Sequence, residues 1–145
     1  MGVSMDGLVA ASLVLGIALG GFVDGIVLHQ VLQWHHMLSG TKFLLTSLHN
    51  LEINTVADGL FHVVTWILTV IGLAMLWRQG KRHPGDWPIG VLVGGLLAGW
   101  GIFDLVEGIV DHQILGIHHL REGSAGYGFL GFWSNSSHRR MAHHA

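Results

Sequence analysis

The sequence predicts an all-α integral membrane protein with three clear transmembrane helices. Half of its 145 residues are hydrophobic and only 11% are charged, whereas soluble domains carry about 25% charged residues. Apolar runs at about 8–32, 56–77 and 89–117 are each long enough to cross a bilayer, which takes about 20 residues. We therefore expect one transmembrane helical bundle over 1–123, followed by a short irregular C-terminal tail over 124–145.

The composition also excludes several classes of protein and site. The chain has no cysteine, which excludes disulfides and thiolate metal ligands. Its formal net charge is −2, so we expect no nucleic-acid partner. It has 12 histidines, a large number for so apolar a chain, and they point to a polar site within the bundle.

The first span, at about 8–32, is expected to be retained in the mature protein. No Lys or Arg precedes the apolar run, as it would in a signal peptide, and the run continues past any cleavage point near Ala18. Small residues four positions apart, such as Gly16 and Gly20, favour close packing against another helix in lipid.

The second span, at about 56–77, begins with polar side chains. Asn50, Asn54, Asp58 and His62 follow one another at four-residue steps, which places them along one side of a helix. The segment just before this span is short and polar enough that we expect an interfacial helix there, at about 43–51.

The third span, at about 89–117, repeats the first. Residues 7–36 recur at 90–119 with a constant offset of 83 and no gap. Each copy ends in one motif, DGIVLHQVLQWHH from 24 to 36 and EGIVDHQILGIHH from 107 to 119, in which an acid, a glycine, a His-Gln pair and a His-His pair keep their register. The matched copies predict a shared polar site.

The loop charges set the orientation of the bundle. Three basic residues lie within 78–88, whereas Lys42 alone lies in the loop after the first span. The positive-inside rule then puts 78–88 in the cytoplasm and 37–55 outside. Spans one and three run in the same direction, which implies a pseudo-two-fold axis along the membrane normal. Both motifs and the Asp58/His62 stripe are expected near the outer membrane face.

The carboxylates in the spans need compensation. An ionised carboxylate near the bilayer centre costs about 2.5–3.5 kcal/mol, so four of them would cost about 10 kcal/mol. The spans contain no Lys or Arg to pair with them. Protonation, a bound cation, partner histidines or water must therefore offset the cost. The four carboxylates are Asp24, Asp104, Glu107 and Asp111.

A transition-metal site is the leading interpretation. Imidazole and carboxylate without thiolate suit Zn, Cu, non-haem Fe or Mn. The predicted ligands are one histidine and one acid from each span: His29 and Asp24, His62 and Asp58, His112 and Glu107. The residues expected around them, as outer ligands or as hydrogen-bond donors, are His35, His36, His118, His119, Gln30, Gln113, Asp104 and Asp111.

Several functions stay open at this point. A metal would serve a redox, oxygenase-like or metal-handling role, and the sequence does not decide whether the protein is an enzyme. His29 and His112 could instead be the two axial ligands of a haem. The protein could also be a metal-free proton or small-solute transporter or an assembly factor, or its polar residues could simply form interhelical hydrogen bonds.

Helix geometry complicates the metal interpretation. On a straight α-helix, Asp24 and His29 lie on faces about 130° apart, so they cannot both point at one small centre. Either there are two neighbouring sites, or the helix is distorted near Gly25 and Gly108, or one of the two faces only packs.

The sequences of these motifs resemble those of a known protein family. The segments FVDGIVLHQ (22–30), QWHHM (33–37), DGLFH (58–62) and EGIVDHQ…HHLRE (107–122) are similar to those of small bacterial integral membrane proteins of unknown function. The resemblance implies a four-helix, multi-pass protein of the bacterial inner membrane and no established activity. No fourth span is readable after Glu122, so we expect a degenerate four-helix bundle with one side open. Besides the lipid bilayer, a second copy of the chain or another membrane protein could cover that side.

Overall fold

The computed structural model describes residues 5–39, 47–84 and 87–114, apart from the side chains of 111–113. Helices make up nearly all of this part of the chain, and three stretches are long and apolar enough to cross a membrane. The predicted all-helical membrane fold is thereby confirmed. In chain order the helices are α1 (Met5–Phe22), the π-helix η1 (Val23–Val31), α2 (Leu48–Arg82), α3 (Ile89–Glu107) and the π-helix η2 (Gly108–Ile114).

The helix ends follow local sequence signals. α2 begins after Ser47, whose hydroxyl accepts a hydrogen bond from the backbone N–H of Asn50 at 3.2 Å, the usual form of an N-cap. It ends just before Pro84, which cannot continue a helix. From Leu48 on, the expected interfacial helix is therefore the first part of α2 itself. The predicted tail at 124–145 lies outside the described residues.

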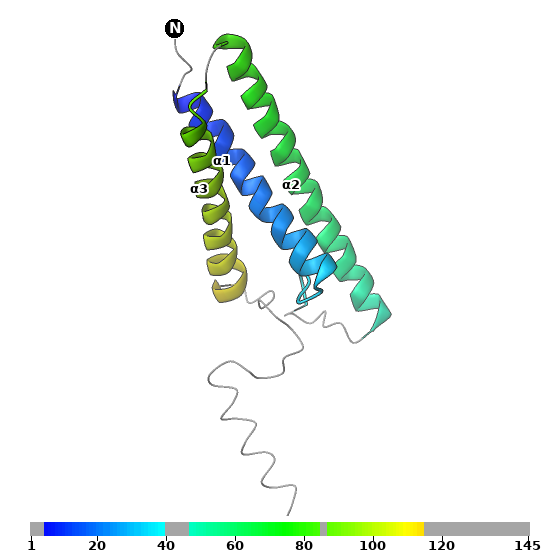
Figure 1. Cartoon of the computed structure of the whole chain (residues 1–145). Helices are drawn as coiled ribbons and strands as arrows, with labels where there is room; N and C mark the ends of the chain where they lie inside the picture. Colours follow the sequence, from blue (N-terminus) through cyan, green and yellow to red (C-terminus); the bar gives the residue numbers. More distant parts are fainter. Residues whose placement is uncertain (1–4, 40–46, 85–86, 115–145) are drawn as a thin grey trace, which may run out of the picture.

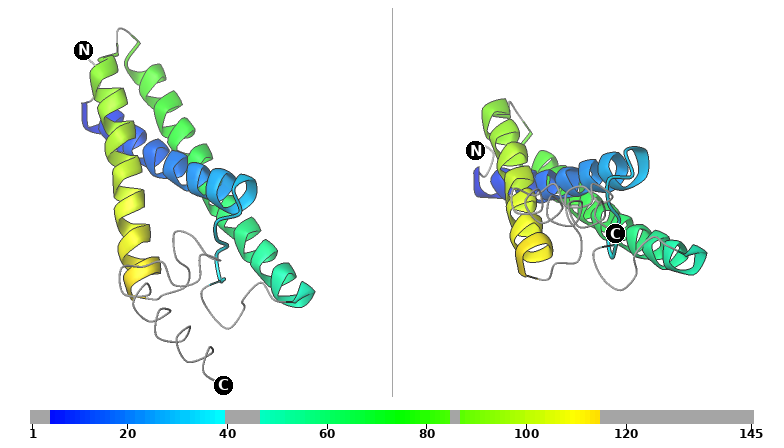
Figure 2. Two further views of the ribbon diagram at one scale, coloured as in Figure 1. Left: turned by 60° about the horizontal axis from the view of Figure 1, so that its bottom comes forward. Right: turned by 90° about the horizontal axis from the view of Figure 1, so that it is seen from below.

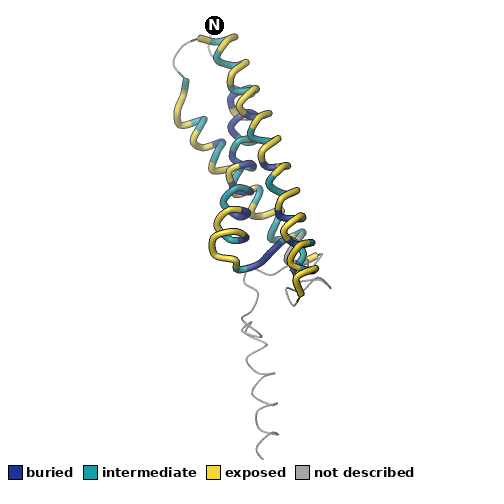
Figure 3. Tube along the Cα trace, turned by 90° about the vertical axis from the view of Figure 1, so that its right-hand side faces the viewer, coloured by how far each residue is buried: buried dark blue, intermediate teal, exposed yellow. Residues whose placement is uncertain are grey.

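α1 is the central helix of the bundle. It lies between α2 and α3 and packs closely against both (Figure 1). α2 and α3 meet through the rings of Phe61 and Phe103, whose centroids lie 6.1 Å apart. Figure 2 shows α1 crossing the other two helices at an angle. Its buried apolar side chains, Leu8, Ala11 and Ala18, are few and mostly small. Most residues of α2 and α3 are exposed, as Figure 3 shows, which is expected of helices that face lipid.

The contact between α1 and α3 is closest at glycines. A Cβ built on Gly16 would lie 2.9 Å from the Cα of Gly99, and the reverse is also true. One turn away, Gly95 packs against the side chain of Ser12. In each pair the two positions differ by 83, the offset of the sequence repeat. A pseudo-two-fold axis between two parallel helices would produce this arrangement.

Both copies of the repeated motif contain a π-helix at matching positions. Within η1, residues 25–31 correspond at the offset of 83 to 108–114, the whole of η2. The end of η1, the first turns of α2 and the end of α3 lie at the same end of the bundle (Figure 1). The polar residues of the three spans are thus gathered at one end.

Candidate metal centre

The π-helix η1 brings Asp24 and His29 onto one face. A π-turn closes with a hydrogen bond to the fifth residue along, so residues five apart lie nearly above one another. His29 Nε2 accordingly lies 3.2 Å from Asp24 Oδ2. Both side chains are buried, with 0% of His29 and 6% of Asp24 exposed. The sequence leaves three ways to reconcile the positions of Asp24 and His29. The structure shows one of them, a helix distorted near Gly25.

After η1 the chain turns back toward the bundle. The backbone N–H groups of Leu32 and Trp34 donate to the carbonyls of Val27 and Leu28, at 2.8 and 2.9 Å. Gln33 has a φ of 49°, the left-handed region that non-glycine residues seldom adopt. Such a conformation persists only where its surroundings hold it in place.

The returning segment buries the first His-His pair. His35 is 1% exposed and His36 is 8% exposed. Ser39 fixes the turn, because its hydroxyl accepts from the His36 backbone N–H at 2.9 Å and donates to the His36 carbonyl at 2.8 Å. Both histidines, expected around the outside of the site, lie inside it.

Asp58 anchors the returning segment to α2. Its carboxylate accepts a hydrogen bond from His36 Nδ1 at 2.6 Å and another from the Met37 backbone N–H at 2.8 Å. One turn earlier, the Asn54 side chain accepts from the Leu38 backbone N–H at 3.0 Å. Asp58 and Asn54 are both 0% exposed. Two residues of the stripe predicted from the sequence, Asn54 and Asp58, therefore hold residues 36–38.

His29 lies between two carboxylates. Its Nδ1 is 3.1 Å from Asp58 Oδ1, and its Nε2 is 3.2 Å from Asp24 Oδ2. A carboxylate can only accept hydrogen bonds, and a neutral imidazole carries one N–H. One of the two contacts therefore needs a further proton, on the imidazole or on a carboxyl group, or a cation beside it. The described Lys and Arg residues all lie in the last two turns of α2, at the other end of the bundle.

Three ligand atoms converge on one side of His29. The carboxylate of Asp24 and one ring nitrogen each of His29 and His35 lie within 4.8 Å of one another, and all three residues are buried. His35 Nε2 is 3.6 Å from Asp24 Oδ1, and the two imidazole rings meet edge to face with centroids 4.6 Å apart. Two ligands on a tetrahedral Zn²⁺ at about 2.0–2.1 Å lie about 3.3 Å apart. The two spacings to Asp24, 3.2 Å from His29 and 3.6 Å from His35, are close to this value.

His62, a predicted ligand, lies outside this group. Its Nδ1 donates to the backbone carbonyl of Asp58 at 2.7 Å. Its ring packs against Gly25, where a Cβ would lie 2.8 Å from its Nε2, and beside Phe22. Gln30 is exposed and does not point into the cluster. The expected positions of Asp111, His112, Gln113, His118 and His119 fall outside the described side chains.

The two remaining predicted acids line a cleft that reaches Asp24. Asp104 and Glu107, near the end of α3, border a space of about 410 Å³ together with Trp100. Asp24 and Leu28 line the same space from η1. The repeat in the sequence predicts that Asp24 lies opposite Glu107, and both face this cleft.

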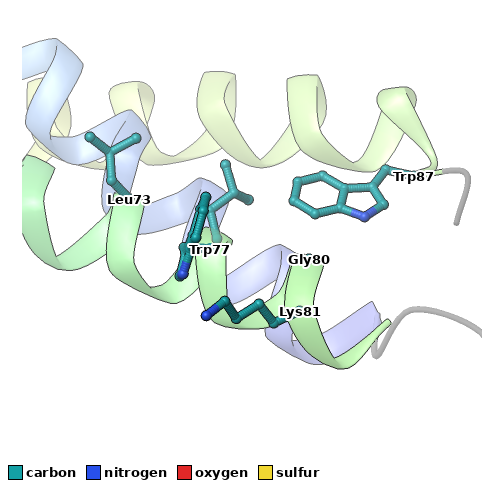
Figure 4. A pocket seen from close by; sticks show the side chains of 6 residues that line it. Leu73, Trp77, Gly80, Lys81 and Trp87 are labelled. Atoms are coloured by element: carbon teal, nitrogen blue, oxygen red, sulfur yellow. The ribbon is translucent and has the colours of Figure 1, made fainter. Parts of the chain in front are cut away.

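A larger cleft, of about 580 Å³, lies at the opposite end of the bundle (Figure 4). Trp77 and Lys81 on α2 line it together with Trp87, and the Lys81 ammonium lies 5.3 Å from the Trp77 ring centroid. No carboxylate or imidazole of the described residues lines it. Its make-up is typical of a membrane-interface anchor and not of a metal site.

A family model described as "Predicted membrane protein (DUF2243)" matches residues 11–139 of the chain. The chain belongs to this family of predicted membrane proteins. The match covers nearly all of the three spans. It also covers the whole polar cluster, which consists of Asp24, His29, His35, His36 and Asp58. No curated protein and no solved structure matches the chain. The family description assigns no activity, so any function is argued from the cluster itself.

The sequence reasoning missed the residues that shape the turn. The sequence suggests only that Ser39 and Gly40 form a turn. Nothing in the sequence predicts that the Met37 backbone N–H binds Asp58. Asn54 belongs to the predicted stripe, which could have identified it as a partner for a backbone group. The inward position of His35 depends on the left-handed Gln33, and no residue preference predicts that conformation there.

Proposed function

We propose that this membrane protein binds one transition-metal ion through Asp24, His29 and His35. The observation that carries the proposal is the convergence of their three ligand atoms within 4.8 Å at a buried position. Burying an unpaired carboxylate in a bilayer costs about 2.5–3.5 kcal/mol. A cation beside Asp24 would offset that cost and would balance the second carboxylate at His29.

The ligand chemistry narrows the choice of ion. Two imidazoles and one carboxylate suit Fe(II), Zn, Cu(II) or Mn and give no advantage to a soft ion such as Cu(I). The three ligands among the described residues leave coordination positions open for water, oxygen or a substrate. An open site of this kind fits a redox, oxygenase-like or metal-handling role. A closed structural site would supply a fourth protein ligand.

Asp58 supports the metal interpretation from the far side of His29. Metal-binding histidines commonly donate their other ring N–H to a carboxylate, which fixes the tautomer and orients the ring. Asp58 Oδ1 lies 3.1 Å from His29 Nδ1, which leaves Nε2 for the ion. His36 and Met37 hold the Asp58 carboxylate in turn. Asp58, predicted from the sequence as a ligand, is better assigned to orienting His29.

Haem is disfavoured by the surroundings of His29. An axial haem ligand needs open space beyond its coordinating nitrogen for a flat macrocycle. At His29, both ring nitrogens face carboxylates, and the ring of His35 stands 4.6 Å away.

A metal-free proton relay is the second candidate. His35, Asp24, His29, Asp58 and His36 form an alternating series in which each neighbouring pair lies 2.6–3.6 Å apart. Series of acids and histidines carry protons in membrane pumps and transporters. The two candidates use the same residues but differ in whether an ion stays bound.

Elemental analysis with an optical spectrum of the purified protein separates these candidates. The metal proposal predicts close to one transition-metal ion per chain and no Soret band. Protein that folds and remains free of metal after growth and dialysis with Fe, Zn, Cu and Mn would overturn it in favour of the relay. A Soret band would reinstate haem.

The membrane setting follows from the sequence and the resemblance. We place the protein in the bacterial inner membrane, with the cluster near the outer face. The exposed apolar faces of α2 and α3 favour a second copy or another membrane protein beside the lipid. Cross-linking in membranes and labelling of engineered cysteines from each side test these two points.

A further inference from the structure

The cleft between η1 and α3 ends at the proposed metal. Asp24 lines this cleft and is also the acid of the metal group. Its side chain is more than nine-tenths buried, and its Oδ1 atom accepts no hydrogen bond from the described residues. A buried carboxylate oxygen without a donor, placed where a cleft meets a cluster of imidazoles, marks a position for a cation.

The outer part of the cleft carries two more carboxylates. Asp104 is exposed and Glu107 is half-buried, and they lie one helical turn apart on α3. The other lining residues are apolar or glycine: Gly20, Val23, Leu28, Trp100 and Gly108. Low-dielectric walls around charges of one sign concentrate the field and raise the local concentration of opposite ions.

We propose that this cleft is the route by which a divalent transition-metal cation reaches the site, with Asp104 and Glu107 attracting it and Asp24 receiving it. The proposal rests on the metal function proposed above. It also assigns a role to two membrane carboxylates that the three-ligand site leaves unexplained. The described Lys and Arg residues lie at the other end of the bundle, so the described charges at the mouth of the cleft are negative and favour a cation.

The rate of metal uptake tests the route by charge. Metal-free protein in neutral detergent micelles is mixed with Co²⁺, whose visible absorption reports binding. The double variant Asp104→Asn with Glu107→Gln should take up Co²⁺ about tenfold more slowly at low salt, with the final stoichiometry and spectrum unchanged. Asp6→Asn, which removes a charge from the exposed first turn of α1 at the other end of the bundle, should match the wild type.

A second pair of variants tests the route by shape. A Cβ built on Gly108, which lines the cleft, meets nothing within 4 Å, and neither does one on Gly101, which does not line it. Gly108→Leu should narrow the cleft and slow uptake without changing any charge. Gly101→Leu should leave the rate unchanged.

The outcomes separate the route from the metal site. Unchanged uptake rates in both the charge and the Gly108→Leu variants would overturn the route while leaving the metal site intact. Loss of stoichiometry in the double variant would make Asp104 or Glu107 a ligand and would also overturn the route. A wild-type protein that binds no Co²⁺ would overturn the metal function and the route together.

Discussion

His29 Nε2 lies 3.2 Å from Asp24 Oδ2, the carboxylate five residues earlier on the same π-helix. On an α-helix these side chains would point to different faces. The π-turns therefore bring an acid and an imidazole that are five residues apart into one site. π-Helical segments are rare and occur frequently at functional sites.

Removing His29 tests its place at the centre of the cluster. His29→Ala should weaken transition-metal binding by at least about 100-fold, because the loss of even a supporting partner commonly costs 10–100-fold. Metal content after dialysis is the measurement. His49→Ala, at an exposed position near the start of α2, is the matched control and should keep its metal. Equal metal loss in the two variants would count against a specific site.

Asp58→Asn tests the orienting role of Asp58. The amide has one acceptor oxygen where the carboxylate has two, so it cannot serve His29, His36 and the Met37 N–H together. We expect metal affinity to fall about 10–100-fold, with the ion still bound at saturation. A competition titration against a chelator measures this. Glu52→Gln, on the exposed side of α2, should change nothing; an unaltered affinity in Asp58→Asn would remove Asp58 from the account.

Much of the fold could be read from the sequence. Apolar length located the three spans, and the basic residues after Trp77 together with Pro84 marked the end of the second. The repeat matches Gly16 with Gly99, which lie in contact, and Asp24 with Glu107, which line one cleft. These features depend on composition and periodicity, which a single sequence displays.

The inner arrangement of the site could not be read in the same way. The winding of η1 as a π-helix and the left-handed Gln33 come from tertiary packing, and neither has a residue signature here. Without that turn, His35 and His36 would be assigned to the membrane edge. His62 shares the Asp58 stripe, but its ring nitrogen is engaged by the Asp58 carbonyl, a contact that spacing alone does not reveal.

A one-residue deletion tests the π-helix directly. Removing Val31, an exposed residue at the end of η1, should let the segment wind as α-helix while Asp24 and His29 stay five residues apart, which turns Asp24 away from His29. We expect metal binding to be lost while the helical circular dichroism stays close to that of the wild type. Val31→Ala keeps the residue count and should bind metal normally. Retained binding in the deletion variant would show that the π-turns are dispensable.

The close contact of α1 with α3 predicts a large effect from a single methyl group. A Cβ on Gly16 would collide with the Leu96 carbonyl oxygen and approach Gly99. Gly16→Ala should therefore destabilise the bundle by about 1–3 kcal/mol, as overpacking does. Gly101→Ala, whose Cβ meets nothing within 4 Å, should be neutral or slightly stabilising. Denaturant midpoints in micelles compare the two, and similar midpoints would contradict the crossing at Gly16.

X-ray absorption at the edge of the bound metal tests the central claim most directly. The account predicts an inner set of nitrogen and oxygen ligands at about 2.0–2.2 Å and outer scattering from two imidazoles. In His35→Ala, scattering from one imidazole should remain. A spectrum with no imidazole scattering, or one left unchanged by His35→Ala, would contradict a metal held by Asp24, His29 and His35.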